Sequence, residues 1–343
     1  MQNSGVTMVS MGKWMRRAAS GGVAAGVLGL LAACGGGTEQ IEPFEPTRYI
    51  AFGDEMSVLT KEVPLGRKYT VNAVASDGVS VDCAANTSTQ PSLLWTQWLG
   101  ANFGFVFAEC NPTNLTVNAY TYAKPGAKAA DFEAQVAEAR AARGGFDCND
   151  LMSVLVGAND VIDLYQNVYL ADPTPGTATA VTNELSARGA RLGRAITALT
   201  DGKGPAVIVS TIPVMSLTPY ARQEAVLRPN ANVLGVLNQF STAFNTALRT
   251  NIPNDGSRWG LVELDAMLNA AVNNPAGYGL VNVIQGVCTV AAPNCLNVAA
   301  DLVVNGNPNT WLWATDLWIG WQAHARLGSF ARTRANDNPF GCG

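Results

Sequence analysis

The sequence predicts a single three-layer α/β domain, in which helices flank a mostly parallel central sheet. Short apolar runs, typical of strands that are buried on both faces, alternate with longer segments whose apolar residues recur at helical spacing. No internal repeat or low-complexity tract interrupts this alternation. The alternation favours a parallel sheet, because parallel neighbours need a crossover connection that is usually a helix.

Four apolar runs are predicted as strands of this sheet. The first ends at Gly53 and leads into a tight acidic turn. The others are continuous apolar or β-branched segments that stop beside polar or turn-forming residues, as buried parallel strands do. The predicted strands span 48–52, 151–156, 206–212 and 259–264.

Five further segments carry apolar residues on one helical face. In the third of them, Gly189 and Gly193 are expected to break the helix softly. In the last, Trp318 and Trp321 are expected on one face of a helix, where aromatic side chains usually belong to the core but could also support sugar rings or acyl chains. The predicted helices span 93–107, 129–143, 185–199, 233–248 and 311–330, and loop-rich excursions span 61–94 and 273–295.

The composition is that of a folded protein and excludes several function classes. Of the 343 residues, 48% are hydrophobic and 14% are charged, so a sizeable core can form. The net charge is -4, and Lys and Arg cluster only near the start of the chain, so nucleic acid is not expected as a partner. No glycine-rich phosphate loop occurs, and no cofactor is expected.

The first 33 residues have the pattern of a secretory signal peptide. Lys13, Arg16 and Arg17 precede an apolar run at 22–31, and small residues follow it. The apolar run is shorter than the roughly 20 residues of a membrane span. Residues 1–33 are therefore expected to be removed.

The sequence Leu31-Ala32-Ala33-Cys34 resembles the lipobox of bacterial lipoproteins. The resemblance implies a lipid on Cys34, the membrane as a partner through this anchor, and a place in the bacterial cell envelope. By the same resemblance, a glycine rather than an aspartate at position 35 implies that the protein is anchored in the outer membrane and not retained at the inner one. Residues 34–46 are expected to form a tether. The folded domain is expected at 47–335, followed by a C-terminal tail at 336–343.

The remaining cysteines suggest disulfides rather than a metal site. An even number of cysteines in an oxidising compartment predicts up to three bridges, of which only the local pair Cys288–Cys295 can be proposed from spacing. Zinc is disfavoured, and no metal is expected, because there is no Cys-x-x-Cys pair and only one histidine. The six cysteines are Cys83, Cys110, Cys148, Cys288, Cys295 and Cys342.

Candidate site residues follow the first two long strands. Asp54, Glu55 and Ser57 come after the first strand, and Gly157-Ala158-Asn159-Asp160 follows the second. Ligands bind outside the carboxyl ends of the strands in open α/β sheets, which makes these residues candidates for a site. The alternative, an ordinary strand-to-helix connection with solvated carboxylates, is the more common case for so short a motif. A glycosidase pair of Asp54 and Glu55 is disfavoured, because neighbouring side chains generally point apart and the two carboxyls must flank one bond.

Three blocks, in the right order, resemble the SGNH/GDSL hydrolase family. They are Phe52-Gly53-Asp54-Glu55-Met56-Ser57, Gly126-Ala127 and Gly157-Ala158-Asn159-Asp160. The resemblance extends from about 44 to 332 and implies a flavodoxin-like domain. It also implies ester hydrolysis by a serine, with an Asp-x-x-His run near the C-terminus. By the same resemblance, Gly126 and Asn159 are oxyanion donors, and Asp160 completes the third block.

All three catalytic positions of the family are replaced in this sequence. Glu55 stands in the place of the serine, and the C-terminal register puts Thr315 and Trp318 in the places of the aspartate and the histidine. We therefore expect a non-catalytic pseudo-hydrolase that binds an acyl or carbohydrate ligand or serves a structural role. The Glu55 carboxylate is expected to accept hydrogen bonds from Gly126 and Asn159.

The alternative is an active carboxylester hydrolase with a displaced triad. His324 is the only histidine and therefore the only candidate for the usual base. Ser57 would be the nucleophile and Asp316 the carboxylate, and the nucleophile and base would have to come within about 3 Å. If instead Trp318 lies where the imidazole would be, it would fill much of the acyl cleft.

Overall fold

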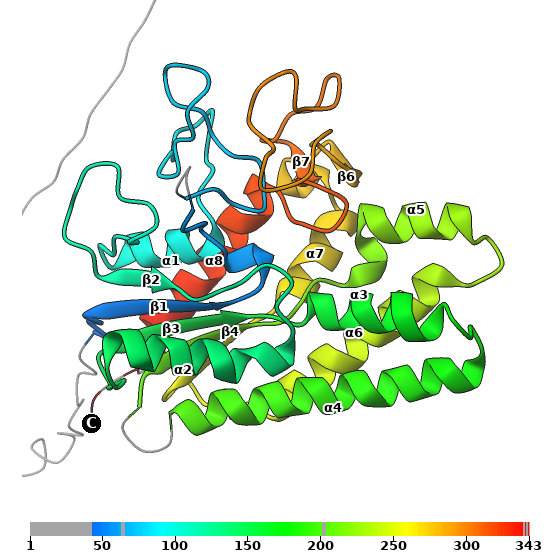
Figure 1. Ribbon diagram of the computed structural model, residues 1–343, viewed down its shortest axis with the longest axis horizontal. Helices are drawn as coiled ribbons and strands as arrows, with labels where there is room; N and C mark the ends of the chain where they lie inside the picture. The colour runs from blue at the N-terminus through cyan, green and yellow to red at the C-terminus, as the bar shows by residue number, and fades with distance from the viewer. Residues whose placement is uncertain (1–42, 63–65, 201–203, 339, 341, 343) are drawn as a thin grey trace, which may run out of the picture. The chain divides into compact units, whose positions relative to one another are not determined.

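The computed structural model describes residues 43–62, 66–200, 204–338, 340 and 342. Its centre is a five-stranded parallel sheet with the order β2-β1-β3-β4-β5 (Figure 1). This is the flavodoxin-like strand order, so the predicted fold class is confirmed. The strands are β1 (Arg48–Gly53), β2 (Ala119–Thr121), β3 (Asp150–Leu155), β4 (Ala206–Ser210) and β5 (Trp259–Val262).

Helices connect the strands as the apolar spacing predicts. The segments predicted at 93–107, 129–143, 185–199 and 233–248 correspond to α1, α2, α4 and α6, although their ends differ by several residues. The helices are α1 (Trp95–Asn102), α2 (Phe132–Arg143), α3 (Ala158–Leu164), α4 (Pro175–Leu199), α5 (Pro219–Leu227), α6 (Val233–Thr250), α7 (Leu264–Asn273) and α8 (Trp321–Asp337).

The helices form a layer on each face of the sheet (Figure 1). Helices α1 and α8 pack together on one face, and α2 and α4 cover the other, where α6 packs along α4. Both β3 and β4 are buried along their whole length. This double burial explains why these strands are continuous apolar runs rather than alternating ones.

The register of the two central strands places the site. Gly53 pairs with Leu155, so β1 and β3 end side by side and their following turns meet at one edge of the sheet. Gly53 has a φ of +138°, and a Cβ atom there would lie 2.0 Å from the Leu155 carbonyl oxygen. Only glycine allows this close approach, after which the Asp54 amide donates to the same carbonyl at 3.0 Å.

The predicted soft break in the third helix is wrong. Helix α4 is continuous over 25 residues, and Gly189 and Gly193 pack against α6 and the residue that ends it. A Cβ atom on Gly189 would lie 2.3 Å from the Phe244 carbonyl oxygen, and one on Gly193 would lie 2.7 Å from the Cβ atom of Asn251. The glycines therefore serve close helix packing, and packing outweighs their weak intrinsic preference against the helix.

The prediction of one helix over 311–330 is also wrong. The segment begins as strand β7 (Trp311–Trp313), which pairs in parallel with β6 (Asn282–Gly286) in a small second sheet. The chain then turns back, with the Gly320 amide donating to the Leu312 carbonyl at 2.7 Å, before α8 begins. Trp318 lies in this turn and Trp321 starts the helix, so the two do not share a helix face.

Three disulfides form within the described residues. The local bridge Cys288–Cys295 is the predicted one, and the others join Cys83 to Cys110 and Cys148 to Cys342. The last bridge holds the end of the chain beside the start of β3, across a separation of 194 residues.

Packed structure extends beyond both predicted domain boundaries. Phe44, near the end of the predicted tether, packs against Phe103 and Phe340 with ring centroids 6.1 and 5.4 Å apart. The predicted signal peptide and Cys34 lie outside the described residues. Among the residues that are described, no helix is both long and apolar enough to cross a membrane.

Candidate functional site

The Glu55 carboxylate is held by the two predicted oxyanion donors. One oxygen accepts a hydrogen bond from the Gly126 amide at 2.8 Å, and the other accepts one from the Asn159 side-chain amide at 2.8 Å. Only 7% of Glu55 is exposed. The hydrogen bonds expected from the sequence are therefore present, and both are charge-assisted.

Strand ends and one loop bring these three residues together. The loop after β2 is tied to β1, because the Lys124 amide donates to the Gly53 carbonyl at 3.0 Å. This contact carries the Gly126 amide toward Glu55. Asn159 lies in the first turn of α3, and its side chain also donates to the Ala127 carbonyl at 3.0 Å. Asn159 thus hydrogen-bonds to the glycine loop and to the Glu55 carboxylate and holds them together.

Asp160 stabilises the glycine loop through partners other than Glu55. One oxygen accepts a hydrogen bond from the Ala129 amide at 2.7 Å, and the other lies 3.1 Å from the guanidinium of Arg188. Asp160 is almost fully buried, and burial raises its pKa although these partners oppose the shift. Its side chain therefore joins the glycine loop to α4 and is not available to a ligand.

Asp54 is fully buried inside the turn and accepts a hydrogen bond from the Met56 amide at 3.2 Å. Burial raises the pKa of Asp54 well above its ordinary value, and the negative charge of Glu55 raises it further. The two neighbouring carboxyls have separate partners. This geometry does not place them on opposite sides of a shared ligand, as a glycosidase pair would require.

The structure keeps Ser57 and His324 apart by placing Trp95 against both. Both residues are fully buried. The Ser57 hydroxyl accepts a hydrogen bond from the Trp95 indole at 3.2 Å, whereas Nδ1 of His324 accepts one from the Trp95 backbone amide at 3.3 Å. No hydrogen bond joins the serine to the histidine within the described chain. The displaced pair is therefore not assembled as a nucleophile and its base.

His324 is also poorly suited to take up a proton. Burial lowers its pKa to about 3, and the positive charge of Lys68 contributes. Asp316, the carboxylate of the displaced triad, is exposed, and its backbone carbonyl accepts a hydrogen bond from the Tyr220 amide. The His324 imidazole therefore stays neutral over the near-neutral pH range in which esterases work.

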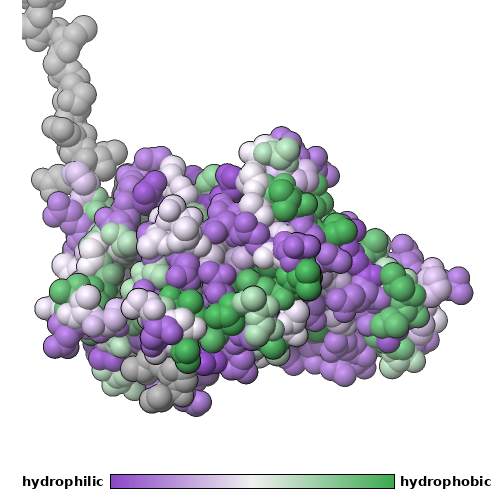
Figure 2. All heavy atoms as spheres, turned by 90° about the horizontal axis from the view of Figure 1, so that it is seen from above, coloured by the Kyte–Doolittle hydropathy of each residue, from purple (hydrophilic) through white to green (hydrophobic). Residues whose placement is uncertain are grey.

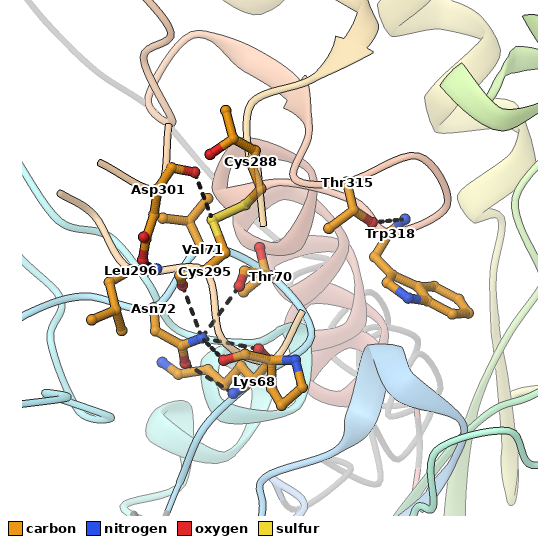
Figure 3. Close-up of a disulfide and its surroundings, with 12 residues drawn as sticks. Lys68, Thr70, Val71, Asn72, Cys288, Cys295, Leu296, Asp301, Thr315 and Trp318 are labelled. Carbon is orange, nitrogen blue, oxygen red and sulfur yellow. Dashed lines mark hydrogen bonds between the residues drawn. A yellow bond between two sulfur atoms is a disulfide. The ribbon is translucent and has the colours of Figure 1, made fainter. Parts of the chain in front are cut away.

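A tight turn forms at Thr315–Trp318, where the resemblance predicts the position of the family's Asp-x-x-His run. The Thr315 hydroxyl accepts a hydrogen bond from the Trp318 amide at 3.1 Å, and the Ala314 amide donates to the Trp318 carbonyl at 2.9 Å (Figure 3). Thr315 thereby stabilises the turn, as short hydroxyl side chains often do. The Trp318 side chain is half-buried and packs against the main hydrophobic core.

Asn72 is a buried residue that sequence reasoning missed. The excursion at 61–94 reads as an aperiodic loop, yet its Asn72 is fully buried and joins this loop to a second segment near Cys295 (Figure 3). Its side chain accepts from the Lys68 amide at 2.9 Å and donates to the carbonyls of Pro293 and Cys295 at 2.9 and 3.2 Å. Asn72 and the Cys288–Cys295 bridge therefore fix the loops above the site.

Tyr69 is a second residue that sequence reasoning missed. It is half-buried, and its pKa is raised by burial and by the negative charges of Glu55 and Glu62. The phenol therefore lies within electrostatic reach of the Glu55 carboxylate. No local pattern around Tyr69 could have indicated this, because the contact depends on how the excursion folds back over the sheet.

Two features of the structure are shared with the family that the sequence resembles: the flavodoxin-like strand order and the positions of the three sequence blocks. The first and third blocks lie at the adjacent ends of β1 and β3, and the glycine loop follows β2 beside them. In fold, the chain resembles the SGNH/GDSL hydrolases. Its SGNH-like architecture brings the Gly126 amide and the Asn159 side chain together, and the Glu55 carboxylate accepts a hydrogen bond from each.

Comparisons with known proteins return solved structures of esterases and a lipase. No family model and no curated protein matches the chain. The structure is similar to Axe2, an acetylxylan esterase from Geobacillus stearothermophilus, with 12% identity and a TM-score of 0.42 over 85% of this chain and 95% of that chain. It is also similar to an extracellular lipase from Streptomyces rimosus, with 14% identity and a TM-score of 0.37 over 65% and 82% of the two chains.

Proposed function

We propose that this protein is a non-catalytic binding or structural module with an SGNH-like fold, held at the bacterial cell envelope by a lipid on Cys34. The observation that carries the proposal is the occupation of both oxyanion donors by Glu55. The Gly126 amide and the Asn159 side chain each donate to this carboxylate at 2.8 Å. They are therefore already paired with a negative charge that belongs to the protein.

Ester hydrolysis needs these donors to be free. They must receive the negative charge that develops on the substrate oxygen, and such preorganised donors usually supply the largest part of the catalytic effect. A substrate carbonyl would have to displace the ionised Glu55 from charge-assisted hydrogen bonds. Ser57 and His324 do not offer a replacement nucleophile and base, because each is hydrogen-bonded to Trp95 instead of to the other.

The ligand class that we propose is an acyl chain or a carbohydrate. Two half-buried aromatic residues support this choice: Tyr69, which lies within electrostatic reach of Glu55, and Trp318, which lies in the turn that replaces the catalytic run. Aromatic faces bind sugar rings and acyl chains through apolar contact. The Glu55 carboxylate, which lies within electrostatic reach of Tyr69, would accept hydrogen bonds from hydroxyl groups of a sugar.

The catalytic status can be tested with a serine-reactive fluorophosphonate and with p-nitrophenyl acetate. We expect no labelling of Ser57, because its hydroxyl is buried and lacks a base. Any slow ester hydrolysis is expected to be unchanged in Ser57→Ala and in His324→Asn. A serine hydrolase treated in parallel controls for the reagent. Labelling at Ser57, or loss of turnover in both folded variants, would establish the alternative, an active carboxylester hydrolase.

The anchor can be tested by fractionating cells that produce the protein. Cys34→Ser is expected to move the protein from the membrane fraction to the soluble fraction and to abolish incorporation of an alkyne-labelled fatty acid. Gly35→Asp serves as the matched control, because it should keep the lipid and change only which membrane holds the protein. A Cys34→Ser protein that stays in the membrane fraction would contradict the proposed anchor.

A further inference from the structure

The face of the molecule seen from above has no single dominant apolar patch. Its apolar side chains lie in several groups that polar side chains separate (Figure 2). The side of the sheet covered by α2 and α4 is different. The two helices run alongside each other there (Figure 1). Residues of both helices line two adjoining hollows of about 530 and 420 Å³. The hollows share Glu133, Ala195 and Ala198 and therefore form one groove.

Alanines form much of the floor of this groove. Ala137 on α2 faces Ala195 and Ala198 on α4, and Ala130 lies at one end. Three of these four alanines are exposed and the other is half-buried. Small side chains on both walls let the backbone of a third element come close, because the distance between packed helices depends on the side chains at their contact.

Positive charge lines the groove, although the chain as a whole has a net charge of -4. Its charged lining residues are one glutamate, Glu133, and four arginines. Arg188 is already paired with Asp160 and Glu184. The other three arginines, which are Arg140, Arg191 and Arg194, have more donors to offer.

The remaining three arginines are only loosely engaged. Arg191 is 61% exposed, and its carboxylate partner Glu184 is 3.7 Å away. Arg194 donates to the Asn251 side chain at 3.3 Å. Arg140 lies over the Phe146 ring at 5.1 Å and makes no side-chain hydrogen bond to any residue that the structure describes. Guanidinium groups with free donors are well suited to bind carboxylates in a bidentate way.

We propose that this groove docks an acidic amphipathic helix of a partner protein. The apolar face of the helix would lie on the alanine floor, as in other helix-in-groove interactions. Arg191 and Arg194, which have donors to spare, lie three residues apart, which is roughly 4.5 Å along α4. Carboxylates spaced three or four residues apart on a docked helix have a similar rise, so the two charge rows can match.

A lipid fits the same groove less well. Drug-sized and similar small ligands bury about 70–90% of their surface in their sites. Both hollows are open to solvent and cannot enclose an acyl chain to that extent. A helix needs to bury only one face. Glu133, the single carboxylate of the lining, would pair with a basic residue of the partner and set its register.

The first test uses the purified protein and a fluorescein-labelled helical peptide with leucine on one face and glutamate rows beside it. We expect binding that weakens with salt, and Arg191→Glu should weaken it at least about tenfold. Arg332→Glu is the matched control, because Arg332 is an exposed arginine of α8 on the other face of the sheet. A peptide with lysine in place of glutamate should bind Arg191→Glu better than it binds the unchanged protein.

Several results would overturn the proposal. A scrambled peptide of the same composition that bound equally well would show unspecific charge attraction. So would equal weakening by Arg191→Glu and Arg332→Glu. No binding of the designed peptide would also count against the groove. None of these results bears on catalysis, so the outcome is independent of the esterase test.

The second test identifies the partner in living cells. A photoreactive benzophenone residue replaces Ala198, which is exposed in the groove, and the control position is Arg332. We expect an adduct only from the groove position, attached to a partner segment that carries acidic residues at intervals of three or four. Adducts with a lipid or with a second copy of this chain would overturn the proposal, as would no adduct.

Discussion

Replacing Cys148 and Cys342 together by serine is expected to lower the free energy of unfolding by about 5 kcal/mol, because their bridge spans 194 residues. A bridge that closes so long a loop removes many conformations from the unfolded chain. It also keeps the buried Phe340 beside Phe44 at the edge of the core. Urea denaturation of the oxidised protein and of the variant measures the difference.

The matched control is the Cys288→Ser, Cys295→Ser protein. Its bridge spans only 7 residues, so the same chain-entropy relation predicts a loss of about 2 kcal/mol. The two variants remove the same number of sulfur atoms and differ mainly in loop length. Equal losses would contradict the account based on loop closure.

Acidification from pH 7 to pH 4 is expected to destabilise the protein by about 3 kcal/mol through His324 alone. In the folded state, burial and the charge of Lys68 lower the pKa of His324 to about 3. In the unfolded state the pKa is about 6.5. Between these values the unfolded chain binds a proton that the folded chain does not, so stability rises with pH across this window and is lost as the pH falls.

His324→Asn isolates this contribution. Its side-chain oxygen can replace Nδ1 as the acceptor for the Trp95 amide, and it does not titrate. Asp54 and Asp160 have raised pKa values and shift stability in the opposite direction, but they are present in both proteins and cancel. Urea denaturation at pH 7 and pH 4 should show a smaller loss for the variant. An equal loss in both proteins would contradict the low pKa of His324.

Local sequence patterns predicted most of the fold because the forces behind them are local. The runs that became β1, β3 and β4 are apolar on both sides of the pleat, since both faces are covered by helices. The resemblance of the Gly53 turn and the Gly157 turn to known blocks also identified the two strand ends that meet. The hydrogen bonds of Glu55 could be anticipated because Gly126 and Asn159 kept their identity.

Patterns failed where one residue type serves two purposes. Gly189 and Gly193 look like helix breakers, but they allow α4 to approach α6. The tryptophans at 311–330 have helical spacing, yet the first of them form a strand because β6 pairs with them. In both places the local structure depends on a segment far away in the sequence, and the spacing of residues along the chain does not indicate which segment that is.

The sequence by itself determined the α/β alternation, the local Cys288–Cys295 bridge, and the two hydrogen-bond donors of the Glu55 carboxylate. Tertiary structure alone decided which partners Ser57 and His324 have. Ser57 and His324 both bind Trp95, and 229 residues separate Trp95 from His324. Such contacts arise from how helices pack across the sheet, so residue identities name the candidate groups but not their partners.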